Sequence, residues 1–322
     1  MTTLFRAPRA LATLLLAGLG ALPAAAQAAP YPTRAIELMV AYQPGGGSDN
    51  TARLIADVAR PLMPQPVVVL NRPGASGSIG WAYVASGQPD GYRTVLMTTE
   101  MLVVPLMGIG KTTVDDFLPI ARFTDDPSSV TVRADAPWKT LEEFLADARK
   151  KPGNVAISNA GIGTVPHLAA AALGEASGVQ FTHVPYQGSS PAIMGLLAGD
   201  VQATTVAYAE LRQHVETGKL RTLAVMADQR VQGLDSPTLK EKGMDLQFSV
   251  WRGIGLPRQA PAEAVAKWRE VARQISESST FDAALRKQNL TPAYADSDAF
   301  AADIARQAAA FKTLVPKLNL KD

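Results

Sequence analysis

The chain has 322 residues, with 31 Lys and Arg against 29 Asp and Glu, and it contains no cysteine. The lack of cysteine excludes disulfides, thiol catalysis and thiolate metal sites. A chain this close to neutral has no general attraction for nucleic acid or for anionic membranes, so neither is expected as a partner. Chains of this length usually divide their core, which predicts two lobes.

The first 28 residues have the three regions of a secretory signal. Arg6 and Arg9 form a basic start, residues 11–22 are apolar and uncharged, and Ala26-Gln27-Ala28 fits the small-x-small cleavage rule. The apolar run is shorter than the roughly 20 residues that span a bilayer as a helix. We therefore predict a cleaved signal and a protein exported to the periplasm, with an uncleaved anchor as the alternative.

Strand-like and helix-like segments alternate after the signal. Short apolar runs predict strands, and apolar residues spaced three or four apart predict helices. The predicted strands cover residues 36–42, 66–70, 94–98, 129–132, 155–158, 179–183, 201–206 and 220–226. The predicted helices cover residues 50–63, 79–86, 141–150, 165–177 and 190–197, and the chain is predicted to be helical from 262 onward. This alternation predicts an α/β fold with mostly parallel sheets and helices on both of their faces.

Three local patterns allow more specific predictions about burial. The strand at 66–70 is entirely apolar, as in strands that are buried on both faces. The adjacent carboxylates Asp115-Asp116 and Asp125-Asp126 diverge in any regular structure, and we interpret them as solvated loop residues. The helix that begins after Pro261 is expected to bury a stripe of Ala264, Val265, Trp268, Val271, Ala272 and Ile275.

Patterns that would indicate catalysis are weak. Gly108-Ile109-Gly110-Lys111-Thr112 resembles the end of a phosphate-binding loop, but position 105 is proline where that motif requires glycine. The sequence has no Gly-x-Ser-x-Gly elbow, and its three histidines, His167, His183 and His214, lack the spacing of metal ligands. We therefore expect no enzyme, no metal and no cofactor. An exported serine–histidine hydrolase is the alternative that the spacing leaves open.

Three glycine-rich loops each join a predicted strand to the following helix. They cover residues 42–49, 71–80 and 159–168. Glycine permits positive φ and lets a ligand approach the main chain closely. Ser48 or Asp49 can cap the helix after the first loop, and free N–H groups at a helix start favour an anion. Because ligands of open α/β sheets bind beyond the carboxyl ends of the strands, these loops predict an anion-binding cleft.

The ordered motifs in and around these loops resemble the Bug family, the extracytoplasmic solute receptors of tripartite tricarboxylate transporters. The matching segments run through the chain after the signal and include Pro44-Gly45-Gly46-x-Ser48-Asp49, Asn71-Arg72-Pro73-Gly74-Ala75, Pro89-Asp90-Gly91-Tyr92, His183-Val184-Pro185-Tyr186-x-Gly188-Ser189 and Trp251-x-Gly253. The resemblance implies a monomeric, two-lobed periplasmic binding protein of the type II-like, Venus-flytrap kind. Its ligand would be a small carboxylate, namely a dicarboxylate, a tricarboxylate or an aromatic acid. Its partners would be inner-membrane permease subunits, and a sensor subunit that presents its ligand to a signalling receptor is the alternative.

The chain order then predicts how the lobes are built. Residues 29–127 would form the first part of lobe one, residues 128–227 would form lobe two, and residues 228–322 would return to complete lobe one. Two crossovers of this kind make a hinge that can close on a ligand.

The resemblance also assigns ligand contacts to both lobes. In lobe one these are Tyr42, Gly46, Gly47, Ser48, Asp49, Ala75, Ser76, Thr98 and Thr99. In lobe two they are Ile162, Gly163, Thr164, His167, Tyr186 and Thr205. The amides of Gly163 and Thr164, at a helix start, would face a ligand carboxylate. His167 is also open to a structural hydrogen bond, and Tyr186 to either closing over the ligand or simply packing.

One position departs from the family pattern. Members of the family usually carry an aspartate at the end of the strand predicted at 201–206, where this chain has Val206. A missing carboxylate would remove the natural partner of a ligand ammonium group. This departure predicts that amino acids are poor ligands and that a less polar or aromatic carboxylate is preferred.

Overall fold

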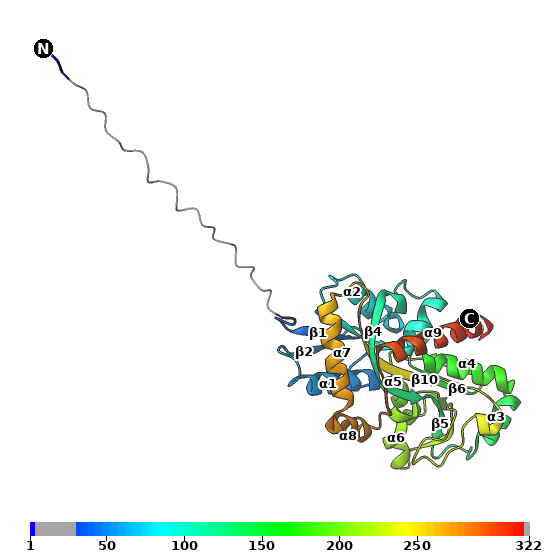
Figure 1. The fold of residues 1–322 in the computed structure, drawn as a ribbon. Coiled ribbons are helices and arrows are strands. Elements are labelled where there is room, and N and C mark those ends of the chain that lie inside the picture. Colours follow the sequence, from blue (N-terminus) through cyan, green and yellow to red (C-terminus); the bar gives the residue numbers. More distant parts are fainter. Residues whose placement is uncertain (4–29, 319–322) are drawn as a thin grey trace. The chain divides into compact units, whose positions relative to one another are not determined.

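The computed structural model describes residues 1–3 and 30–318, and the compact unit of the chain begins at Tyr31 (Figure 1). The predicted signal at 1–28 lies almost entirely outside the described residues. Within the described part of the chain, no helix is both long enough and apolar enough to cross a bilayer.

The compact unit contains two β-sheets, which confirms the predicted α/β class. The first has the strand order β11-β4-β10-β3-β1-β2 and the second has the order β7-β6-β8-β5-β9. The strands of the first sheet are β1 (Ile36–Val40), β2 (Val67–Asn71), β3 (Arg93–Thr98), β4 (Phe117–Pro127), β10 (Ser249–Pro257) and β11 (Pro292–Ala295). Those of the second are β5 (Ser129–Arg133), β6 (Ala156–Asn159), β7 (Thr182–Pro185), β8 (Ala203–Thr204) and β9 (Leu220–Val225). We call each sheet with its covering helices a lobe.

Helices connect most of the strands. They are α1 (Gly47–Ala59), α2 (Ser78–Ala85), α3 (Leu141–Lys150), α4 (Val165–Ser177), α5 (Ser189–Ala198), α6 (Tyr208–Glu216), α7 (Ala262–Ser276), α8 (Ser279–Lys287) and α9 (Ser297–Leu314). The apolar stripe of α7 is confirmed, because Ala264, Trp268, Val271, Ala272 and Ile275 are buried and only Val265 is half-buried. The sequence patterns missed α6, and they missed β11 within the predicted C-terminal helical region.

Both sheets are mixed, so the prediction of mostly parallel sheets was wrong. In the first sheet β1 runs parallel to β2 and β3, but β10 is antiparallel to β3 and β4, and β11 is antiparallel to β4. In the second sheet β6 runs parallel to β7 and β8, whereas β5 is antiparallel to β8 and β9. The chain passes from β4 directly into β5 and therefore changes sheet without the helical crossover that a parallel neighbour needs.

The strand β2 was also misjudged. It is the outermost strand of the first sheet, and Val68 is 49% exposed. An apolar run alone does not distinguish an edge strand from a central one. The predicted strand at 179–183 is displaced to β7, and only Ala203–Thr204 of the segment 201–206 joins the ladder as β8.

The chain crosses from the first sheet to the second at Pro127–Ser129, and it returns to the first sheet just before Ser249. The predicted first limit, at 127/128, falls between β4 and β5. The second limit, at 227/228, is too early, because the segment after β9 still binds that strand. The N–H of Leu239 donates to the carbonyl of Val225 (2.9 Å), and Ser236 Oγ donates to the carbonyl of Thr222 (2.8 Å). The return to the first sheet comes about 20 residues later, with β10.

The C-terminal helix contributes to both lobes. α9 packs on β4 of the first sheet, and the short helix after it, η6 (Val315–Leu318), contacts α4 of the second lobe (Figure 1). Buried Phe311 and Val315 belong to the same apolar cluster as Leu168 of α4. The two lobes therefore share part of one apolar core.

Candidate functional site

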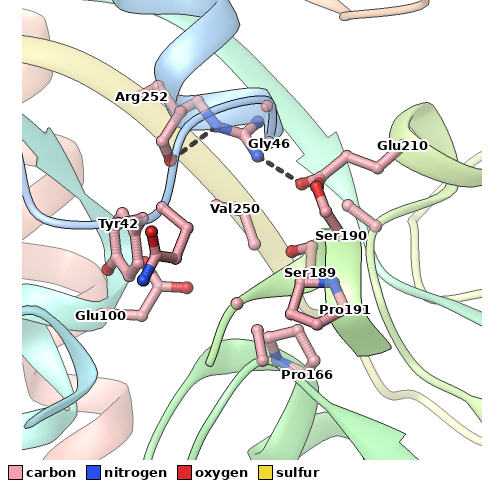
Figure 2. A pocket seen from close by; sticks show the side chains of 16 residues that line it. Tyr42, Gly46, Glu100, Pro166, Ser189, Ser190, Pro191, Glu210, Val250 and Arg252 are labelled. Carbon is pink, nitrogen blue, oxygen red and sulfur yellow. Dashed lines mark hydrogen bonds and ion pairs between the residues drawn. The ribbon is translucent and has the colours of Figure 1, made fainter. Parts of the chain in front are cut away.

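A cavity lies between the lobes, where the loops after β1, β3 and β6 meet the starts of α5 and α6 (Figure 2). We call it the main cavity, and its volume is about 40 Å³. The first lobe lines it with Tyr42, Gln43, Gly46, Gly47, Ser48, Glu100, Val250 and Arg252. The second lobe lines it with Ala160, Pro166, Gly188, Ser189, Ser190, Pro191, Ala207 and Glu210.

A second cavity of about 270 Å³ shares Tyr42, Ala160 and Gly188 with the main cavity. We call it the side cavity. Its other walls come from the loop after β2, including Ala75 and Ser76, and from Ile162 and Tyr186 of the second lobe. Because the two cavities have walls in common, they form neighbouring compartments of one cleft.

Three helices have their N-cap residue in the wall of the main cavity. Their N-cap residues are Gly46 for α1, Gly188 for α5 and Ala207 for α6, none of which has a side-chain oxygen to accept from the first turn. The first N–H groups of a helix have no partner within the helix, and they carry the positive end of its dipole. The cavity is thus surrounded by amide donors from both lobes, which is an environment that stabilises an anion.

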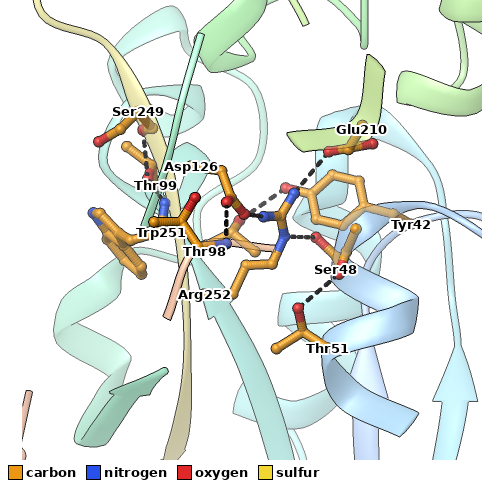
Figure 3. A network of polar contacts seen from close by, with 12 residues as sticks. Tyr42, Ser48, Thr51, Thr98, Thr99, Asp126, Glu210, Ser249, Trp251 and Arg252 are labelled. Carbon is orange, nitrogen blue, oxygen red and sulfur yellow. Dashed lines mark hydrogen bonds and ion pairs between the residues drawn. The ribbon is translucent and has the colours of Figure 1, made fainter. Parts of the chain in front are cut away.

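A buried guanidinium connects the two lobes beside this cavity (Figure 3). Arg252 of β10 is 1% exposed. Its Nη1 donates to Asp126 Oδ2 at the end of β4 (2.5 Å), and its Nη2 donates to Glu210 Oε1 in the first turn of α6 (2.7 Å). Its Nε donates to Ser48 Oγ in α1 (3.2 Å). One side chain therefore ties two strands of the first lobe to one helix from each lobe.

This arrangement explains why position 47 is glycine. A Cβ atom at Gly47 would lie 2.5 Å from Arg252 Nη2 and 3.0 Å from Glu210 Oε1. Real Cβ atoms do not approach other heavy atoms this closely, so any side chain at 47 would displace the guanidinium. A side chain at the first residue of α1 and the guanidinium of Arg252 would therefore occupy the same space.

The interpretation of Asp126 as a solvated loop residue was wrong. It is fully buried, and besides Arg252 it accepts a hydrogen bond from the N–H of Thr291 (2.7 Å). Burial raises the pKa of Asp126 to about 6 against the opposing pull of Arg252. Its neighbour Asp125 faces the other side of β4 and is half-buried, as expected for successive residues of a strand.

Eight of the fifteen predicted ligand contacts line one of the two cavities. Tyr42, Gly46, Gly47 and Ser48 line the main cavity, and Ala75, Ser76, Ile162 and Tyr186 line the side cavity. Ser76 and Ile162 also touch across the cleft, since Ser76 Oγ donates to the carbonyl of Ile162 (2.6 Å).

Several predicted contacts are committed to internal hydrogen bonds instead. Asp49, 3% exposed, accepts from the N–H of Gly45 and from the side chains of Arg53 and Asn71, and it therefore shapes the loop. Thr98 Oγ1 pairs with Tyr42 Oη (3.0 Å). Thr99, which directly follows β3, binds β10, because its Oγ1 donates to the carbonyl of Ser249 and accepts from the N–H of Trp251. Thr205 Oγ1 donates to the carbonyl of Pro166 (2.6 Å).

The predicted amide site at the start of α4 is not available to a ligand. The N–H of Gly163 donates to His167 Nδ1 (3.1 Å), and the N–H of Thr164 donates to the carbonyl of Gly161 (3.2 Å). Gly163 and Thr164 are buried and line neither cavity. His167 thus takes the structural role that the sequence left open. Burial, followed by its neighbour His183, lowers the pKa of His167 to about 4.

Val206 does not leave the cleft without a carboxylate. Its side chain is buried in an apolar cluster with Ile193, Leu196 and Leu211 of the second lobe, and it lines neither cavity. Glu100 and Glu210 line the main cavity. The premise on which amino acids were predicted to be poor ligands is therefore wrong.

The sequence patterns did not point to Glu100, Glu210 or Arg252. A usable signal was present for two of them. Arg252 follows Val250 and Trp251, and Glu100 precedes Met101 and Leu102, so each charge sits in an apolar segment. Charged side chains are rarely buried unless they are paired, so such a position indicates a buried network or a site. Within residues 1–3 and 30–318, no group of three or more His, Asp or Glu side chains is arranged to bind a metal ion.

Two lobes around a cleft that is surrounded by helix starts define a solute-binding protein. The chain belongs to the tripartite tricarboxylate transporter receptor family, and the sequence pattern of that family matches residues 51–320. A relative from Cupriavidus necator, the UPF0065 protein in the gbd 5' region, is 34% identical over 98% of this chain and 96% of its own length.

Solved structures agree with this assignment. A TctC solute binding protein from Polaromonas, described as without ligand, is 45% identical and covers 89% of this chain and 99% of its own, with a TM-score of 0.70. The periplasmic binding protein BugD is 30% identical over 90% and 99% of the two chains, with a TM-score of 0.84. R. palustris Rpa4515 with adipate is 28% identical over 89% and 97%, with a TM-score of 0.82. The Polaromonas protein and BugD are named as binding proteins, and this chain belongs to a receptor family rather than to a family of enzymes.

Removal of the guanidinium should destabilise the fold strongly. Arg252→Met leaves Asp126 and Glu210 buried without their partner, and breaking a buried pair in this way costs about 3–5 kcal/mol. The Arg252→Met/Asp126→Asn double variant should lose less than the sum of the two single losses, because it removes opposing charges together. Urea unfolding of the wild type, the two single variants and the double variant measures this coupling. Strictly additive losses would show that the side chains do not act as a network.

The histidine in α4 should make stability depend on pH. Its pKa of about 4 in the folded protein lies below the value of about 6.5 in unfolded chains. As the pH falls from 6.5 towards 4, the unfolded chain binds a proton that the folded protein does not, so stability present above pH 6.5 is lost by up to about 3 kcal/mol. His167→Gln, which keeps an acceptor for Gly163, should flatten this part of the unfolding profile. Parallel profiles for variant and wild type would contradict the assignment.

Proposed function

We propose that this receptor captures a small carboxylate in the cleft between its lobes and delivers it to the permease of a tripartite tricarboxylate transporter. The observation that carries the proposal is the meeting of three helix N-termini, those of α1, α5 and α6, at one cavity. Unpaired amides and aligned dipoles provide a site for a carboxylate without a free cationic side chain.

The dimensions of the cleft suggest how an elongated acid would lie. The main cavity has room for only a few water molecules, and the side cavity is several times larger. A carboxylate in the main cavity would therefore leave the rest of the ligand in the side cavity, beside Tyr42. Adipate, which Rpa4515 holds, is an elongated acid of this kind. A buried carboxylate is costly unless each oxygen is hydrogen-bonded, so amides from both lobes are required.

The lobes would close on the ligand by rotation about the two strand connections. A ligand favours closure only by the amount by which it binds the closed form more tightly. Amides from α1 on one lobe and from α5 and α6 on the other supply this difference. Rigid rotation of one lobe also lowers a whole-chain superposition score without altering either lobe. This would account for the lower score of the more similar Polaromonas chain.

Export completes the proposal. The basic, apolar and small-residue regions at 1–28 would direct the chain across the inner membrane and be removed. The mature receptor would act in the periplasm as a monomer, with no cofactor, and present its closed form to the permease subunits.

A thermal-shift screen tests the proposed ligand class. Dicarboxylates, tricarboxylates, aromatic acids and amino acids are each added to the protein that lacks residues 1–28. A ligand at 100 times its dissociation constant should stabilise the fold by about 2.7 kcal/mol and raise the midpoint visibly. Binding of a neutral sugar, with no response to any acid, would refute the proposal.

A matched pair of variants tests the role of the helix starts. Ser190 is the second residue of α5 and lines the main cavity. Ser190→Asp places a negative charge where a ligand carboxylate would bind, whereas Ser190→Asn has nearly the same size and no charge. Like charges about 5 Å apart repel by roughly 3 kcal/mol at an effective dielectric constant of 20.

Titration calorimetry with the acid found in the screen should show at least tenfold weaker binding for Ser190→Asp than for Ser190→Asn. Both variants should fold, because an acidic residue is favourable in the first turn of a helix. Equal affinities would place the carboxylate elsewhere.

A further inference from the structure

Glu100 has an unusual position for a carboxylate. It lies in η2 (Thr99–Leu102), the short helical turn that directly follows β3. It is 4% exposed, and its side chain forms part of the wall of the main cavity opposite Pro166 and Ser189 (Figure 2). The carboxylate is therefore shielded from bulk water while it faces the cleft.

One oxygen of this carboxylate is left without a partner. Glu100 Oε2 is buried and accepts no hydrogen bond from residues 1–3 or 30–318. A buried acceptor without a donor is costly, and more so when it is charged. Because Glu100 lines the main cavity, a donor on a bound molecule can approach its carboxylate group.

The protein groups nearby are engaged elsewhere. Tyr42 Oη pairs with Thr98 Oγ1, and burial together with the nearby charge of Glu100 raises the pKa of Tyr42, so it stays a neutral phenol. The guanidinium of Arg252 is shared among Asp126, Glu210 and Ser48. Tyr42 and Arg252 lie close enough to influence Glu100, but within residues 1–3 and 30–318 no ion pair joins Arg252 to it.

The charged side chains around the main cavity also favour a ligand that carries a positive charge. Among the described residues around it, Glu100, Glu210 and Asp126 carry three carboxylates, and Arg252 carries the single guanidinium. A ligand with only carboxylate groups would add negative charge to this surplus. A ligand that also carries a cation would reduce it and would give Glu100 a charge-assisted hydrogen bond.

We propose that Glu100 binds an ammonium group of the ligand, and that the receptor selects carboxylic acids that also carry an amine. The carboxylate would lie at the helix starts and the ammonium at Glu100, so that the two ends of one molecule meet the two kinds of polar group in the cleft. This inference rests on the proposed capture of a carboxylate and adds the second group that the ligand must carry.

Titration calorimetry with matched acids tests the selection. The pairs are succinate and aspartate, glutarate and glutamate, adipate and 2-aminoadipate, and butanoate and 4-aminobutanoate, which differ within each pair by one amine. In at least one pair the amino acid should bind at least tenfold more tightly. If the amine-free members bind equally well or better in every pair, this inference is wrong while the proposed function stands. If no acid of any pair binds, this inference is wrong, and the tricarboxylates and aromatic acids of the thermal-shift screen then decide the proposed function.

A variant assigns the preference to the residue. Glu100→Gln keeps the size of the side chain and removes its charge, so the ratio of the two affinities should fall to within about threefold of one. Glu270→Gln removes an exposed carboxylate from α7, far from the cleft wall, and should leave the ratio unchanged. Thermal unfolding confirms that both variants are folded. A preference for the amino acid that survives in Glu100→Gln would exclude Glu100 as its source.

Discussion

The buried guanidinium of Arg252 is the constraint on which the geometry of the cleft depends. It fixes the end of β4 through Asp126, the first turn of α1 through Ser48 and the first turn of α6 through Glu210. Removing such charges from water is expensive, and the interior compensates only where the partners are placed accurately. The network is therefore better understood as a device that sets positions than as a source of stability. The positions it sets are those of helix starts that line the main cavity.

The same network explains how carboxylates can coexist with an anion-binding site. Glu210 lies in the first turn of α6, where the helix dipole favours a negative charge, and it shares the guanidinium with Asp126. Its charge is thus largely balanced within the protein. Glu100 has no comparable partner among the described residues. Of the two glutamates in the cavity wall, only Glu100 has a charge that a ligand can complement.

The sequence was sufficient for local features and insufficient for those set by long-range pairing. The apolar stripe of α7 and the glycine loop before α1 could be read directly, because each depends on neighbouring residues. The strands β4 and β10 could not, since prolines and glycines interrupt their pattern and their pairing joins segments more than 100 residues apart. The edge position of β2 likewise depends on which strands are absent beside it, and its own sequence carries no sign of that.

The candidate site was predictable to a similar extent. The resemblance to a receptor family located the loops after β1 and β2, but it assigned ligand amides to the start of α4, where His167 takes the N–H of Gly163. It also offered no reason to expect Arg252, which stands at the unspecified position of Trp251-x-Gly253. The burial of Asp126 followed from that same unforeseen partner. The motifs that carry the resemblance located the glycine loops, and they did not indicate the charged residues that line the cleft.

The steric exclusion between Gly47 and Arg252 has a consequence for how this cleft can change over generations. A side chain at 47 collides with the guanidinium as long as Arg252 is present, so that substitution is closed to the chain in its current form. Replacement of Arg252 by a smaller residue would remove the two closest of these contacts, so that only Glu210 Oε1, at 3.0 Å, would still have to give way. The two substitutions are therefore ordered, with 252 first. A side chain at the first residue of α1 is accommodated more readily once the guanidinium at 252 has been lost.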